Sequence, residues 1–187
     1  MKVCFLLITL MLTAPTLSAS SNINATQISQ SHTAFFNNIK KLCGQSLEGA
    51  TQFPQNPDHP MVGKRLLLTF GSCKDKETRV SFQVGEDKSR TWILRLDENG
   101  LLLKHDHRHA DGTPDAVTMY GGWASAEGTA YRQLFPADPD TKKLIPEAAT
   151  NVWMIEIAEE KQEIVYYLER HKEPRYRAVF QMKPLKK

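Results

Sequence analysis

RVSFQVGEDKSRTWILRL, residues 79–96, is the stretch that decides the fold of this 187-residue chain. Apolar and polar side chains alternate in it on both sides of a short break, Gly85-Glu86-Asp87. A period of two places the apolar side chains on one face of an extended strand, and Gly and Asp between two such runs are typical of a turn. The stretch therefore predicts two antiparallel strands that share one buried face. The side chains of that face are Val80, Phe82, Val84, Trp92, Leu94 and Leu96.

The same alternation continues over most of the chain after residue 64 and predicts nine strands in all. An open sheet of that size would expose strand edges and leave an apolar face uncovered. An antiparallel up-and-down β-barrel removes both problems, so we predict a mainly β fold with one such barrel. The predicted strands cover residues 66–70, 80–84, 92–96, 101–109, 117–120, 129–135, 153–157, 164–168 and 176–182.

One short helix is predicted before the strands. Ser31 can cap it and Gly44 can end it, and the apolar residues between them fall at helical spacing. The preceding residues 20–30 are small and polar without a pattern, which predicts a flexible leader. Residues 31–187 are then expected to form a single β-barrel domain, because their number suits one hydrophobic core. The apolar residues of the helix are Phe35, Phe36, Ile39 and Leu42.

Residues 1–19 have the pattern of a secretory signal peptide. Lys2 supplies the positive start, an apolar run of about ten residues follows, and cleavage is expected near Ala19. Such a run is too short to span a membrane as a helix. Its removal leaves two of the three cysteines, Cys43 and Cys73, and an even pair in an exported chain predicts a disulfide. We therefore expect the protein in the periplasm or secreted.

The charge of the chain is small. Its 24 basic and 21 acidic residues give a formal net charge of +3, and the two signs are interspersed. Neither a nucleic-acid partner nor a membrane-surface partner is indicated by this pattern. No segment after the signal is apolar enough to predict a membrane-spanning helix.

A helix packed on one end of a small up-and-down barrel resembles the calycin superfamily, which comprises lipocalins and fatty-acid-binding proteins. This resemblance covers residues 31–185 and implies the barrel architecture. Three stretches are also similar to exported bacterial proteins of unassigned function, and this likeness spans most of the mature chain but implies no activity. The three are Ser89-Arg90-Thr91-Trp92, the HDHRHADGTPD run of residues 105–115, and Val117-Thr118-Met119-Tyr120-Gly121-Gly122.

The candidate functional residues lie at the end of one predicted strand, in the run His105-Asp106-His107-Arg108-His109. Alternate positions of a strand face the same way, so the three imidazoles are expected on the face of Leu101 and Leu103. Neutral imidazoles bind Zn and other transition ions, and three of them leave a fourth position open for water. A transition metal held by His105, His107 and His109 is therefore one hypothesis.

An interior ligand site is the second hypothesis for the same row. In this site the three imidazoles and Tyr120 contact a small molecule, and Trp92 and Trp153 line its apolar part. No nucleophile elbow is present to indicate an acyl-transfer enzyme. The sequence thus predicts an exported, monomeric, small-molecule-binding protein without a resident cofactor. A metal-dependent enzyme or metal-binding protein is the alternative, and a purely structural or partner-binding role stays open.

Two smaller expectations concern the surroundings of the histidine row. Lys104, Asp106 and Arg108 alternate with the histidines, so we expect them on the outside of the barrel in cross-strand ion pairs. The pair Gly121-Gly122 predicts a bulge or bend where the barrel turns a corner.

Overall fold

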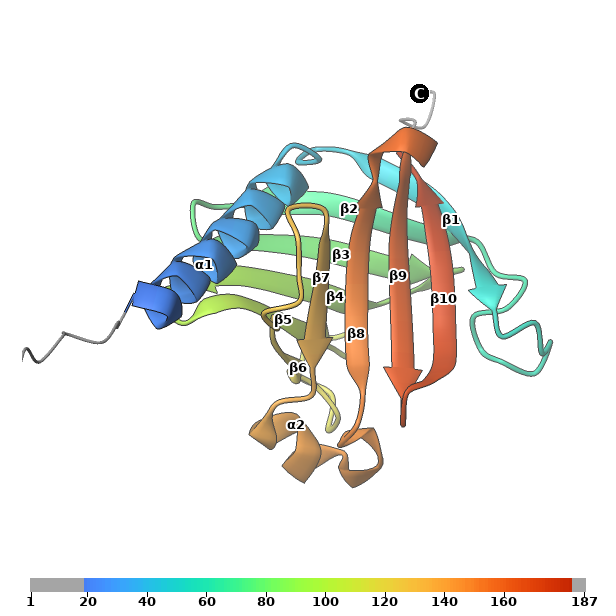
Figure 1. Ribbon diagram of the computed structural model, residues 1–187. Coiled ribbons are helices and arrows are strands. Elements are labelled where there is room, and N and C mark those ends of the chain that lie inside the picture. The colour runs from blue at the N-terminus through green and yellow to red at the C-terminus, as the bar shows by residue number, and fades with distance from the viewer. Residues whose placement is uncertain (1–18, 183–187) are drawn as a thin grey trace, which may run out of the picture.

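The structure, a computed structural model, describes residues 19–182. These residues form one antiparallel sheet of ten strands that curls into a nearly closed barrel, with a long helix across one end (Figure 1). The mainly β, calycin-like architecture predicted from the sequence is thereby confirmed. The elements are α1 (Ala19–Lys40), β1 (Ser46–Phe53), β2 (Leu66–Cys73), β3 (Glu77–Val84), β4 (Asp87–Asp97), β5 (Gly100–His107), β6 (Tyr120–Trp123), β7 (Arg132–Pro136), α2 (Pro139–Leu144), η1 (Pro146–Ala148), β8 (Val152–Ala158), η2 (Glu159–Lys161), β9 (Glu163–Arg170) and β10 (Glu173–Gln181).

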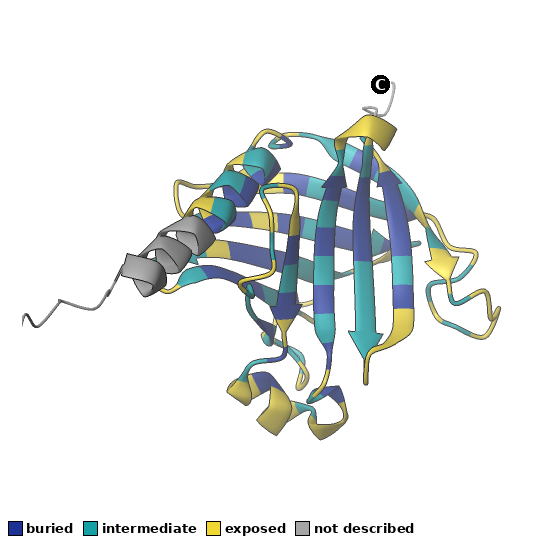
Figure 2. Ribbon diagram, viewed as in Figure 1, coloured by how far each residue is buried: buried dark blue, intermediate teal, exposed yellow. Residues whose placement is uncertain are grey.

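Neighbouring strands of the sheet are consecutive in the chain, except that β1 pairs with β10 and that β6 and β7 form the two edges. The order is β6-β5-β4-β3-β2-β1-β10-β9-β8-β7, so the first strand pairs with the last. In Figure 1 strands β2 to β5 cross behind β7 to β10. Apolar side chains from both groups meet between them and form one continuous core. Figure 2 shows the consequence along β8 (Val152–Ala158), where buried residues alternate with partly buried ones.

The alternation of residues 79–96 is confirmed as the hairpin of β3 and β4. Eight of the nine predicted strands are found with shifted ends, and the strand predicted over residues 117–120 was wrong except at Tyr120, where β6 begins. The tenth strand, β1, was missed because Gly49 occupies one of its interior positions. A Cβ atom there would lie 2.4 Å from Cδ1 of Phe180 on β10, so the ring of Phe180 fills the space that an apolar side chain would otherwise take.

The barrel closes between β6 and β7 through side chains and close backbone contact. The hydroxyl of Thr141, on α2, accepts from the backbone N–H of Gly121 and donates to the carbonyl of Gly121, each at 2.8 Å. At Gly122 an added Cβ would lie 1.8 Å from the carbonyl oxygen of Pro136. The glycine pair was predicted to mark a corner of the barrel, and it is the point at which β6 touches the end of β7 and the residues that follow it.

The helix α1 begins at Ala19, so the prediction that residues 20–30 form a flexible leader and that the helix starts at Ser31 was wrong. Residues 20–31 contain neither Gly nor Pro, so nothing in them ends a helix that extends backwards from the buried turns. Phe35, Phe36 and Ile39 are fully buried in the core.

Two polar side chains hold α1 against the loop between β6 and β7. The Nδ2 group of Asn38 donates to the carbonyl of Ala130 at 2.9 Å, and Nε2 of His32 lies 3.3 Å from the carbonyl oxygen of Ser125. The helix therefore covers one end of the barrel and leaves the other end free of it (Figure 1).

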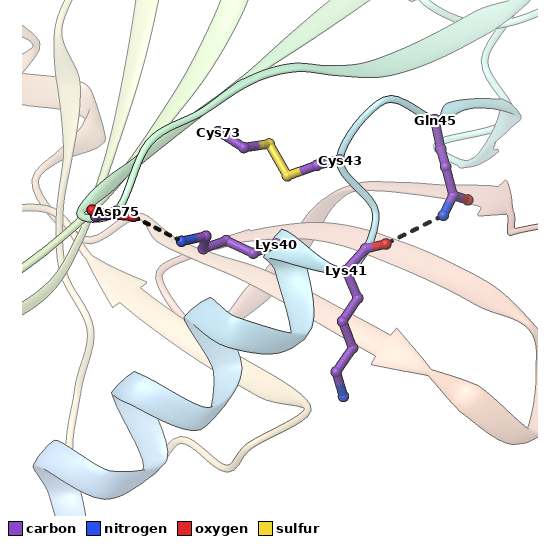
Figure 3. The surroundings of a disulfide bond; sticks show 6 residues. All are labelled: Lys40, Lys41, Cys43, Gln45, Cys73 and Asp75. Atoms are coloured by element: carbon purple, nitrogen blue, oxygen red, sulfur yellow. Dashed lines mark hydrogen bonds and ion pairs between the residues drawn. A yellow bond between two sulfur atoms is a disulfide. The ribbon is translucent and has the colours of Figure 1, made fainter.

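The predicted disulfide is present between Cys43 and Cys73 and joins the end of α1 to the end of β2 (Figure 3). An ion pair between Lys40 and Asp75, 3.8 Å apart, lies beside it. The bond closes a segment with a sequence separation of 30. It thus ties the helix to the barrel that it covers.

Among residues 19–182 no helix is long and apolar enough to cross a membrane. The predicted signal peptide of residues 1–19 lies, except for Ala19, outside the described residues.

Gly122→Ala is expected to lower the free energy of unfolding by about 2–3 kcal/mol, because its methyl group collides with backbone that cannot yield without opening the barrel between β6 and β7. Urea denaturation measures this change. Gly71→Ala is the matched control, since a Cβ at Gly71 meets no atom within 4 Å. Equal effects of the two substitutions would contradict the assigned role of Gly122.

Replacing both cysteines, Cys43→Ser with Cys73→Ser, is expected to lower the free energy of unfolding by about 3–4 kcal/mol, because the unfolded chain regains the entropy of the open loop. Denaturation of the variant and of the reduced protein should agree. Asp75→Asn removes only the neighbouring exposed ion pair and should cost less than about 1 kcal/mol. A double cysteine variant as stable as the original chain would refute this account.

Candidate functional site

A cavity of about 270 Å³ opens at the end of the barrel opposite α1. Loops β1–β2, β5–β6 and β7–β8 and the ends of β9 and β10 surround it. Four aromatic residues, Tyr120, Trp153, Tyr166 and Tyr176, form much of its wall. His59 stacks on Tyr176 with a ring separation of 5.5 Å and extends this wall toward the entrance. The cavity is therefore a mostly apolar recess with several aromatic rings in its wall.

A smaller chamber of about 50 Å³ lies deeper in the barrel and shares Met61, Tyr120 and Tyr166 with the outer cavity. Its other walls are supplied by β3, β4 and β5. They include the polar side chains of Arg90, Thr91, His105 and His107 and the rings of Phe82 and Trp92.

Strand register assembles this chamber. Across the β4–β5 ladder Trp92 lies opposite His105, and Arg90 lies opposite His107. Across β5–β6 His105 lies opposite Tyr120. Directly opposed side chains of an antiparallel pair touch, so two ladders bring these five residues together.

His105 is the buried centre of the group. Its Nδ1 lies 3.2 Å from the carbonyl oxygen of Tyr120, and its Nε2 lies 2.8 Å from the hydroxyl of Tyr166. Burial lowers the pKa of His105 to about 3, so the imidazole is neutral at physiological pH. A carbonyl oxygen only accepts hydrogen bonds, which places the single proton on Nδ1. Nε2 is then an acceptor, and the Tyr166 hydroxyl donates to it.

His107 lies nearer the entrance. Its Nε2 and the hydroxyl of Tyr120 are hydrogen-bonded at 2.9 Å. Burial, and next the charge of Arg90, lower the pKa of His107. Burial also raises the pKa of Tyr120 to about 12. The guanidinium of Arg90 is bound to the carboxylate of Asp87, so the charge that enters the chamber is already paired.

His109 does not join the other two histidines. Strand β5 ends at His107, and the chain then turns back on itself with the N–H of His109 donating to the carbonyl of Thr113 at 2.9 Å. His109 is exposed in this turn. The expectation that three imidazoles share one face was therefore wrong for the third, because the strand ends two residues earlier than predicted.

The metal hypothesis gains no support from this arrangement. Within residues 19–182, no group of three or more His, Cys, Asp or Glu side chains is placed to hold a metal ion. The Nε2 atoms of His105 and His107 both face tyrosine hydroxyls.

The outer face of β5 carries ion pairs, as expected, but they do not join neighbouring strands: Lys104 pairs with the residue before α2, and Asp106 pairs with Arg108 two residues on in the chain. Lys104 binds Asp138 at 2.5 Å, and Asp106 accepts from Arg108 at 2.9 Å, with Arg79 3.8 Å away. These pairs lie outside the barrel and leave the interior face to the histidines.

Several site residues were missed from the sequence. Tyr166 and Tyr176 fall on the interior positions of two strands that were predicted correctly, and Arg90 continues the interior series of Trp92 and Leu94 toward the open end. In the sequence, these three residues could have been found as polar side chains at strand positions that face the barrel interior. His59 lies in an irregular loop that gave no such signal.

The fold and the recess define a calycin-like barrel with a cavity at its open end. Comparison of the chain with family models, with curated proteins and with solved structures finds no match.

His105 is expected to make stability fall with acid. Its pKa is lower in the folded protein than in the unfolded chain, so its contribution is complete above about pH 6.5 and is lost as the pH falls toward 3. Between pH 7 and pH 5 this loss amounts to about 2 kcal/mol. Urea denaturation at several pH values measures it.

His105→Gln should flatten this pH dependence, although His59 and His107, whose pKa values are also lowered, keep part of it. His109→Gln, in the exposed turn, is the control and should leave the curve unchanged. If His105→Gln loses as much free energy of unfolding in acid as the original chain, His105 does not have the assigned neutral state.

Proposed function

We propose that the protein binds a small organic molecule in the recess at the open end of its barrel. The observation that carries this proposal is the cavity of about 270 Å³ with the polar chamber of about 50 Å³ beneath it. Ligand sites in proteins are typically apolar or aromatic recesses with a few placed polar groups. Five of the six residues predicted from the sequence lie in these walls, namely His105, His107, Tyr120, Trp92 and Trp153.

The distribution of side chains supports a site at this end. Toward α1 the interior is filled by Phe35, Phe36, Ile39 and their neighbours, all fully buried. Toward the open end the interior residues become tyrosine, histidine and arginine, and space is left between them. A barrel whose interior served only packing would not require this change in residue type.

The aromatic walls favour a ligand with a flat ring system. Tyr120 and Trp153 lie 5.7 Å apart between ring centroids, and Trp153 lies 5.2 Å from His105. Aromatic rings pack well against such surfaces in stacked or tilted arrangements. The volume suits one or two fused rings rather than a long chain.

Export is part of the proposal. The predicted signal peptide and the disulfide Cys43–Cys73 support it, because disulfides persist in oxidising compartments. The protein would then act as a binding protein of the periplasm or the cell exterior.

Isothermal titration with 2-naphthol tests the binding. We expect saturable binding of one molecule with a dissociation constant on the order of 10⁻⁵ to 10⁻⁴ M, given the size of the probe. Leu168→Trp should abolish it, because Leu168 lines the cavity and the larger ring fills the recess. Leu144→Trp is the matched control, since Leu144 is exposed on α2, and should bind normally. Absent binding, or binding that Leu168→Trp leaves unchanged, would refute the proposal.

A further inference from the structure

The deep chamber contains one buried donor without a partner. Trp92 is 2% exposed and forms part of the chamber wall. Its Nε1–H group has no hydrogen-bond partner within the described part of the chain. Buried polar groups in proteins are nearly always paired, and an unpaired one is unfavourable. This indole N–H therefore has the property expected of a group that an external acceptor completes.

The same chamber contains a hydroxyl group, that of Tyr166, which already donates its one proton to another residue. The hydroxyl of Tyr166 donates to Nε2 of His105, because the single imidazole proton is on Nδ1 and points to the carbonyl of Tyr120. A hydroxyl has one proton and two lone pairs. The oxygen of Tyr166 can therefore only accept a further hydrogen bond. The rings of Tyr166 and Trp92 lie 4.6 Å apart, so the two groups belong to one small space.

The wall of the outer cavity repeats this polarity at Tyr176. The hydroxyl of Thr51 donates its single proton to the carbonyl of Met61 at 3.0 Å. Tyr176, whose oxygen lies 2.9 Å from Oγ1 of Thr51, must then be the donor of that hydrogen bond. Its oxygen also offers only lone pairs. The hydroxyl oxygens of Tyr166 and Tyr176 can thus accept but not donate a further hydrogen bond. They disfavour ligand groups that are themselves only acceptors.

We propose that the chamber is a subsite for the hydroxyl group of the ligand, which accepts from Nε1–H of Trp92 and donates to the hydroxyl oxygen of Tyr166. This inference rests on the proposed function and names the ligand class as a neutral hydroxylated aromatic compound. A hydroxyl both donates and accepts, so it satisfies both walls. A carboxylate or an ether leaves the lone pairs of Tyr166 facing lone pairs, and an ammonium group leaves Trp92 without an acceptor.

A series of two-ring probes separates these classes by calorimetry. 2-Naphthol is compared with naphthalene, 2-methoxynaphthalene and 2-naphthoate, which share its rings. We expect 2-naphthol to bind about five- to tenfold more tightly than each of the others, as two neutral hydrogen bonds warrant after their exchange with water. Equal binding of 2-naphthol and naphthalene, or tightest binding of 2-naphthoate, would overturn the inference and leave the proposed function standing. Absent binding of all four probes would overturn both.

Trp92→Phe removes the indole N–H and keeps an aromatic ring. It should reduce the preference for 2-naphthol over naphthalene to about twofold or less. Trp123→Phe is the matched control, because Trp123 lies in β6 outside the lining of both spaces, and it should keep the full preference. An unchanged preference in Trp92→Phe would count against the subsite.

Nuclear magnetic resonance of the unaltered chain gives a readout that does not depend on the folding of a variant. The chain has three tryptophans and hence three indole N–H signals. 2-Naphthol should shift the signal of Trp92, and naphthalene should shift it much less. A Trp92 signal that responds equally to both compounds would show that the hydroxyl group does not reach the indole N–H, and it would overturn the subsite.

Discussion

Ten strands form a barrel here only because β1 pairs with β10, which joins the first strand of the chain to the last. This pairing gives every strand of the described chain an inside and an outside face, so the period of two in the sequence becomes a division between core and surface. It also requires Gly49, since a side chain there would occupy the place of the Phe180 ring. Strands β6 and β7 are not joined by a ladder of backbone hydrogen bonds. The hydrogen bonds of Thr141 to Gly121 and the close backbone contact at Gly122 hold this junction together.

The two ends of the barrel differ because only one has a helix to fill it. The diameter of a barrel grows with the number of its strands, so a nearly closed sheet of ten strands encloses more space than its own interior side chains fill. At one end α1 contributes three large apolar side chains to that space and is held by the disulfide and by Asn38. At the other end loops surround the opening, and the interior residues leave a recess. The site is therefore a consequence of where the helix is attached.

Most of the fold could be predicted from the sequence because apolar and polar residues alternate along most strands, and this alternation indicates which face of a strand is buried. Strand β1 could not, since its interior glycine depends on a contact with Phe180, more than a hundred residues away in the chain. The interior direction of His105 and His107 followed from their parity with Leu101 and Leu103. The exposure of His109 did not, because it depends on the turn that ends β5. Tyr166 was missed as a partner of His105 because the two strands that carry them are not neighbours in the sheet.

The polar groups of the recess are better explained by binding than by stability. A buried imidazole that must stay neutral makes the protein sensitive to acid, and a buried indole N–H without a partner is unfavourable. Apolar residues at these positions would continue the core formed by Leu101, Leu103 and Phe82 without either effect. Two of these unfavourable groups, Trp92 and His105, lie opposite each other across the β4–β5 ladder, and Arg90, His107 and Tyr120 are their neighbours in the same ladders. Such local departures from an otherwise consistent core are typical of functional sites. Because His105 in its neutral state directs the proton of Tyr166 away from the chamber, only the lone pairs of the Tyr166 oxygen are left to face it.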